Sequence, residues 1–354
     1  CSAGHTGILC AVCTDGYFQQ FGRCASCGGA GAGVAWLITA VLVFVAAGVG
    51  ALFFKFKDVL PVDQLKVTLS FVQIIASANT AYRIPWPAVF AGFLDAMRVF
   101  LVEVLSLTRA NCAQPMTFYS SLVATLVGFK VLVLCLVVIP AVVTKFKARR
   151  QQSSLPAALA SAAQITHNID WGKIFKVTFL FLFVAYPGIN LKIMRMFKCV
   201  EVEGQPWLVA NMRLECYTGE WYSHATYAVV MGVLYTAGLP LAILVILVKN
   251  RGRLRESETL AKWGFLYEVY GVQAYLWEVE ELVRKLMLSA LVVLMNDGDP
   301  LQVMAAVVVS GWAHVGHSLF KPWREVGVDG RYTYALQHVA LFVTSFVYLV
   351  GLLF

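Results

Sequence analysis

The chain has 354 residues, of which 59% are hydrophobic and only 14% are charged, and its mean hydropathy is +0.72. A soluble globular protein of this size cannot be that apolar, and several apolar runs exceed the roughly 18 residues that span a bilayer. We therefore predict an all-α polytopic membrane protein, because the strands of a membrane barrel would be short alternating segments. The net charge of +8 then indicates cytoplasmic Lys and Arg rather than a nucleic-acid partner.

Residues 1–28 differ from the rest of the chain in being rich in cysteine and glycine. The stretch CSAGHTGILC has the C-x-x-G-x-x-G-x-x-C spacing of the last loop of an EGF-type module, and the segment resembles the laminin-type EGF-like modules of extracellular proteins. That resemblance implies the pairs Cys1–Cys10 and Cys13–Cys24, and it leaves Cys27 over. As the first residue is not methionine, we expect the sequence to be a piece of a longer chain, preceded and followed by further residues.

A zinc site is the alternative interpretation of the same cysteines. Cys10, Cys13, Cys24 and Cys27 follow a C-x₂-C-x₁₀-C-x₂-C pattern, which is a plausible set of zinc ligands. The glycine spacing after Cys1 and the extracellular position expected for this module favour disulfides.

About eight transmembrane helices are expected after the module, and basic loops set their orientation with the N-terminal module outside. The predicted spans are residues 33–54, 65–84, 117–143, 171–191, 222–248, the apolar half of 275–295, 301–320 and 332–354. Pro187 with Gly188, and Gly238 with Pro240, predict kinks in the fourth and fifth spans.

Residues 88–108 are apolar enough to span the bilayer, yet they contain Asp95, Arg98 and Glu103. If this segment crossed, the later basic sequence KFKARR would lie outside, against the positive-inside tendency. We therefore expect a helix that lies on the outer surface or re-enters the membrane.

Lys130 lies near the centre of the third predicted span. An unpaired ammonium there costs roughly 2.5–3.5 kcal/mol on insertion scales, so the side chain should face protein or water. Asp95, Glu103 and Glu278 are the candidate partners. A structural buried pair and a transport site both remain open.

The segment 275–295, YLWEVEELVRKLMLSALVVLM, is charged for two turns and then nearly pure hydrocarbon. Glu280 to Arg284 and Glu281 to Lys285 have the favourable i,i+4 order of acid before base. One interpretation is that these charges and Glu278 mark the water boundary of the sixth span. The other is an intramembrane network of charges that gates the domain or couples its segments to one another. Their expected cytoplasmic position favours the second interpretation, in the form of a ring of charged residues that couples the preceding linker to the spans.

Eight cysteines are expected on the outer side, and an even number allows complete pairing. Cys199 and Cys216 bracket an outer hairpin, and Cys27 with Cys112 would complete the set, although exchange among these four is an open alternative. Cys135, inside the third span, should remain a free thiol.

His314 and His317 are one turn apart in the seventh span, a spacing that fits metal binding, a proton relay or plain helix packing. The absence of a third ligand nearby favours packing. The sequence also lacks a P-loop, a Rossmann fingerprint, H-E-x-x-H, G-x-S-x-G and a TVGYG filter. We therefore predict neither an enzyme nor a cofactor or metal.

Several pieces resemble a family of large algal and protist surface proteins whose cysteine-rich repeats end in a multi-pass, TRP-like region. They are GHTGILCAVCTDGYF, LSFVQIIASANTAYRIPWPAVF, WGKIFKVTFLFLFVAYP, LECYTGEWY and YEVYGVQAYLWEVEELVRKLMLSALVVL. The resemblance implies an extracellular EGF-like module, residues 1–28, above a TRP-like membrane domain, residues 29–354. The chain departs from TRP channels in one respect, because the link NDGDP between the sixth and seventh spans is too short for a pore segment.

Two functions follow as expectations. The first is a channel-like or sensory domain, acting as a homo-oligomer or with a separate channel subunit. The second is a non-conducting anchor for an extracellular filament or matrix protein, associated with a separate channel. Either would sit in the lipid bilayer of the plasma membrane, the ciliary membrane included.

Overall fold

The computed structural model describes residues 1–14, 16–20, 23–27, 62–82, 84–101, 117–153, 171–296, 299–323 and 327–353. The predicted first span and the predicted residues Glu103 and Cys112 lie outside the described residues.

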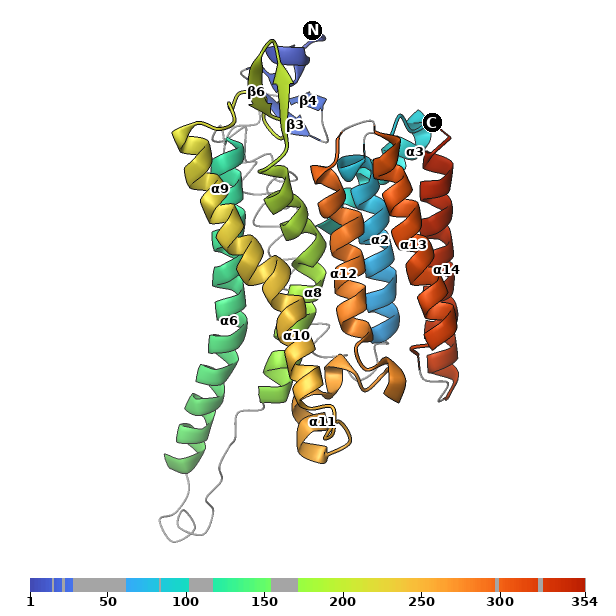
Figure 1. The fold of residues 1–354 in the computed structure, drawn as a ribbon. Helices are drawn as coiled ribbons and strands as arrows, with labels where there is room; N and C mark the ends of the chain where they lie inside the picture. Colours follow the sequence, from blue (N-terminus) through green and yellow to red (C-terminus); the bar gives the residue numbers. More distant parts are fainter. Residues whose placement is uncertain are drawn as a thin grey trace.

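Long helices lie side by side along most of the length of the molecule, as Figure 1 shows. The α-helices are α2 Val62–Ala81, α3 Ala88–Met97, α6 Phe118–Ser153, α8 Trp171–Arg195, α9 Gly219–Met231, α10 Gly238–Lys249, α11 Ser257–Trp263, α12 Trp277–Ser289, α13 Pro300–Phe320 and α14 Gly327–Gly351. Short helical turns adjoin them at η2 Arg98–Leu101, η4 Gly264–Leu266, η5 Val272–Ala274 and η6 Leu291–Leu294, and the π-helical turn η3 Gly232–Ala237 joins α9 to α10.

The strands form three small antiparallel hairpins. They are β1 His5–Thr6 with β2 Val12–Cys13, β3 Tyr17–Gln20 with β4 Arg23–Ser26, and β5 Cys199–Val202 with β6 Gln205–Leu208; the turn η1 Ile8–Cys10 lies between β1 and β2. All three hairpins lie at one end of the molecule, together with α3 and the C-terminal end of α14 (Figure 1). The turn around α11 lies at the opposite end.

Five helical segments in the described part of the chain are long and apolar enough to cross a membrane. They are Phe118–Phe146, Ile174–Arg195, Gly219–Lys249, Pro300–Phe320 and Gly330–Gly351. The predicted count of about eight spans is therefore not confirmed. The second and sixth predicted spans are helical, but α2 carries a polar stripe and α12 ends after 13 residues.

The polar stripe of α2 explains how a helix with so many hydrophilic residues packs inside the bundle. Lys66, Ser70, Gln73 and Ser77 recur at intervals of three or four residues, so they share one helix face, and all four are buried. Gln73 donates its amide to the backbone carbonyl oxygens of Phe100 and Val184. The stripe therefore faces protein rather than lipid.

The segment predicted to lie on the surface or re-enter forms α3 and the turn η2 as far as Leu101. The C-terminal end of α2 and the N-terminal end of α6 lie at the same end of the molecule (Figure 1). Helix α3 lies at that end too (Figure 1), in agreement with a segment that lies on the surface or re-enters.

Disulfides hold the hairpins. Cys1–Cys10, Cys13–Cys24 and Cys199–Cys216 are bonded, which are the expected pairs. Cys27 is also disulfide-bonded, and its expected partner, Cys112, is outside the described residues. The zinc interpretation is wrong, because the four cysteines it requires are already oxidised. Within the described residues, Cys135 is free, as predicted.

The N-terminal module rests on the outer hairpin of the membrane domain. The Arg213 guanidinium, which follows β6, donates to the backbone carbonyl of Cys13. The two disulfide-closed segments thus form a single outer cap at the end of the bundle (Figure 1).

Candidate functional site

The charged first half of α12 lies inside the helix bundle. Glu278 and Lys285 are fully buried, and Glu281 and Arg284 expose only 5% and 6% of their surface. The interpretation that these charges mark the water boundary is therefore wrong for these four residues. Helices α2, α8, α10 and α13 pack around α12, so its charged face meets protein on several sides.

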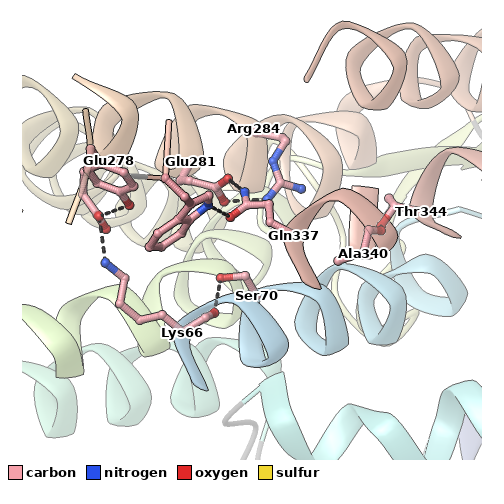
Figure 2. Close-up of polar contacts among 10 residues, drawn as sticks. Lys66, Ser70, Glu278, Glu281, Arg284, Gln337, Ala340 and Thr344 are labelled. Atoms are coloured by element: carbon pink, nitrogen blue, oxygen red, sulfur yellow. Dashed lines mark hydrogen bonds and ion pairs between the residues drawn. The ribbon is translucent and has the colours of Figure 1, made fainter. Parts of the chain in front are cut away.

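Lys66 of α2 forms an ion pair with Glu278, the first carboxylate of α12. Its Nζ lies 2.7 Å from Oε2 of Glu278 (Figure 2), and the Tyr270 hydroxyl donates to the same oxygen at 2.8 Å. Burial and the neighbouring Glu278 carboxylate raise the pKa of Tyr270 well above its ordinary value, so the hydroxyl keeps its proton and remains a donor. This pair and Tyr270 join α2, α12 and the linker that precedes α12.

Glu281 is the second buried carboxylate. Nη2 of Arg284 lies 2.5 Å from its Oε2, and the amide of Gln337 on α14 donates to its Oε1. Gln337 in turn accepts a hydrogen bond of 2.9 Å from the indole N–H of Trp323. Figure 2 shows the carboxylate between the guanidinium and the amide.

The predicted i,i+4 ion pairs are not the ones that form. Arg284 pairs with Glu281, three residues earlier, rather than with Glu280. Lys285 makes no hydrogen bond to Glu281, and its Nζ lies 3.3 Å from the ring centroid of Phe183 on α8. The reason is tertiary packing, because Gln337 and Phe183 reach α12 from other helices.

Among the described residues of the cluster, Lys285 is the basic side chain without an ion-pair partner. Among the described residues, its ammonium has no hydrogen-bond partner, and the Phe183 ring is its close neighbour. The Lys66 ammonium lies 4.9 Å from the centroid of that same ring. A ring face attracts cations more strongly when they are desolvated, so Phe183 stabilises both lysines. The cluster contains three buried basic side chains and two paired carboxylates.

A small cavity of about 10 Å³ lies beside the cluster, between α2, α12 and α14. Ser70, Glu281, Arg284, Gln337 and Thr344 contribute polar groups to its lining. That volume is about the room that one water molecule needs. At this cavity, the charged cluster therefore has room for about one water molecule.

The other predicted charges lie apart from this cluster. Asp95 on α3 accepts a hydrogen bond of 2.7 Å from Asn79 and lies 3.5 Å from Arg98. Lys130 lies on an exposed face of α6, with Nζ 4.9 Å from the ring centroid of Tyr227. The expectation that Asp95 or Glu278 neutralises Lys130 is wrong, because both carboxylates have other partners.

The two histidines of α13 pack against α14. The His317 ring is 4.6 Å from that of Tyr334 and nearly parallel to it, and the His314 ring is 4.5 Å from that of His338. Within the described ranges, no group of three or more potential ligands is placed to hold a metal ion. The contacts fit the packing interpretation.

Sequence reasoning missed the residues that complete the cluster, which are Lys66, Tyr270, Phe183, Trp323 and Gln337. The three-to-four-residue spacing of polar residues in α2 was a usable signal for Lys66. Nothing local distinguishes Gln337 or Phe183, because each contacts α12 from a helix distant in the sequence.

Comparison with known proteins gives a limited match. No protein-family profile and no solved structure match the chain. Among curated proteins, the chain is similar to cysteine repeat modular protein A of Toxoplasma gondii, with 23% identity over 155 residues. The match covers 40% of this chain and 5% of that relative, so the chain spans a small part of the relative's length. Together with the N-terminal disulfides, it fits a cysteine-rich modular protein with a membrane domain.

Proposed function

We propose that this chain is the membrane domain of a larger cell-surface protein and that it works as a TRP-like, channel-like sensory domain. In this proposal, a stimulus acting on the extracellular side changes the ion pairs around α12. The buried cluster of Lys66, Glu278, Glu281, Arg284 and Lys285 is the observation that carries the proposal.

Buried ion pairs are weak evidence for stability alone, since apolar residues of similar size often replace them without loss. Ionisable residues inside a membrane domain are expensive, and their usual role is functional. Here they connect three helices to the linker residues Tyr270 and Trp323, on the side opposite the cap. A shift of α12 relative to α2 or α14 would break these contacts and form others.

Electrical recording tests the proposal. The purified chain is reconstituted into planar bilayers, and currents are compared for the wild type, Glu278→Gln and Glu258→Gln, whose site on α11 is exposed. We expect currents from the wild type and from Glu258→Gln. Glu278→Gln should change the voltage or the membrane tension at which current appears, and it should leave ion selectivity unchanged. A folded wild-type protein that stays silent over a wide range of voltage and membrane tension would contradict the proposal.

A non-conducting anchor is the second candidate, and the small cavity favours it. The cavity described beside the charged cluster has a volume of about 10 Å³, too small for an ion path. On this proposal, the domain holds an extracellular filament or matrix protein to the plasma membrane or the ciliary membrane, and a separate subunit conducts. Deleting the membrane domain should then release the extracellular part from cells. Continued attachment would exclude the anchor role.

A further inference from the structure

Lys130 lies in the least buried of the candidate membrane spans that the structure describes. The apolar segment Phe118–Phe146 of α6 is only 17% buried, compared with 61% for Ile174–Arg195 of α8. Lys130 comes twelve residues after Phe118, which is about 18 Å along the helix axis. Its side chain is therefore well inside the apolar zone.

The immediate surroundings of Lys130 are hydrocarbon and one aromatic ring. Val127, Val131 and Leu134 are exposed on the same helix. The ammonium lies 4.9 Å from the ring centroid of Tyr227 on α9. Among the residues that the structure describes, no carboxylate pairs with Lys130, and Asp95 and Glu278 are already engaged. The ring holds the charge at the α6–α9 face but does not neutralise it.

We propose that the α6–α9 face around Lys130 is a docking surface for a transmembrane helix of a different protein, one that presents an Asp or Glu carboxylate at the same depth. Charge complementarity is the basis, since an intramembrane ammonium is stable when it faces an anion inside a helix interface. The flanking Val127, Val131 and Leu134 provide the apolar contact area for such a helix.

The described helices of a second copy of this chain do not provide such a carboxylate. Helices α6, α8, α10 and α13 contain no Asp or Glu. In α9 and α14, the acidic residues are confined to the first turn. In α12, Glu278 and Glu281 are buried and Glu280 is half-buried. Among the described spans, none presents a carboxylate to lipid at mid-depth. The inference depends on α6 spanning the membrane and not on conduction by the domain.

A designed peptide tests the surface directly. The probe is a leucine-rich transmembrane peptide of about 20 residues with one central Glu, and its twin carries Gln instead. Energy transfer between labelled peptide and labelled chain in phosphatidylcholine vesicles, at mildly alkaline pH, reports association. We expect the Glu peptide to associate about tenfold more tightly than the Gln peptide. No current is measured, so failure here is separate from failure of the channel proposal.

Variants of the chain localise the effect. Lys130→Met should abolish the preference for the Glu peptide, while Lys130→Arg and Lys145→Met, the latter at an exposed cation farther along α6, should keep it. Equal association of the Glu and Gln peptides with the wild type would overturn the proposal, whatever the variants do. An unchanged preference in Lys130→Met would also overturn it, and would fit a lysine that extends to lipid phosphates.

Discussion

Glu281 and Glu278 are both paired, but the two pairs differ in what they connect. Arg284 and Glu281 are on the same helix, so their ion pair moves with α12 as a unit. Lys66 belongs to α2 and Gln337 to α14, so their bonds to α12 link separate helices. Relative movement of the helices is therefore resisted by the bonds of Lys66 and Gln337 rather than by Arg284.

Removing one partner of the Lys66–Glu278 pair should be costly. Glu278→Gln leaves the buried Lys66 ammonium without its carboxylate partner, and loss of a buried partner costs about 3–5 kcal/mol. We expect a loss of that size in the free energy of unfolding, measured with denaturant in detergent micelles. Glu258→Gln, at the exposed site on α11, is the matched control and should change little.

The double variant Lys66→Met with Glu278→Leu separates charge burial from packing. It removes both charges, so it should be less destabilised than either single variant. Additive losses in the double variant would show that the two side chains do not depend on each other.

The resemblance to EGF-type modules was enough to predict the short-range disulfides of residues 1–28, but no local pattern predicted the burial of the charged residues. Cys13 and Cys24 are 11 residues apart in a compact hairpin, so their pairing is nearly a local property. Lys66 and Glu278 are 212 residues apart. A run of charged residues before an apolar run has the same sequence pattern whether water or other helices surround it. The burial of Glu278 could therefore be recognised only from the position of α2 in the fold.

At the level of the helix, the bend between α9 and α10 depends on a residue of α8. Pro240 has no N–H and cannot donate to the carbonyl of Thr236, four residues earlier. The Tyr186 hydroxyl donates to that carbonyl at 2.6 Å instead. The π-helical turn Gly232–Ala237 precedes the proline, where the sequence had predicted a kink.

Tyr186→Phe should leave the Thr236 carbonyl without a donor. An unsatisfied buried acceptor costs about 1–3 kcal/mol, so we expect a loss of that size in unfolding free energy. Adding Pro240→Ala to this variant supplies a backbone N–H and should recover part of the loss. Equal effects of Tyr186→Phe in the Pro240 and Ala backgrounds would contradict the role of the hydroxyl.

Gly188 sets how closely η2 approaches α8. A Cβ at this position would overlap the carbonyl oxygen of Leu101, a backbone atom that has little freedom to move. Gly188→Ala should therefore destabilise the fold by about 3 kcal/mol or more. Gly128→Ala is the control, because a Cβ there meets nothing within 4 Å. That change should be neutral or stabilise by up to about 1 kcal/mol. Similar melting temperatures for the two variants would contradict the close approach.

The direction of each described helix was predictable, because basic loops and cysteines segregate to opposite ends. The hairpins and α3 lie at one end, and the stretch from the C-terminal end of α10 through α11 lies at the other (Figure 1). The lengths of α2 and α12 were not predictable in the same way. Their polar faces are covered by neighbouring helices, and hydropathy does not record which face a neighbour covers.

The state of the nine cysteines tests the arrangement of the whole molecule in one measurement. An outer cap in an oxidising compartment requires its cysteines to be paired, whereas Cys135 on α6 is a free thiol. Alkylation of the denatured, non-reduced chain should therefore add a single label by intact mass, and Cys135→Ser should remove it. Reduction before alkylation should raise the count to nine. Three or more labels without reduction would mean that at least one expected pair is open, and the cap would then lack part of the covalent frame that joins its hairpins.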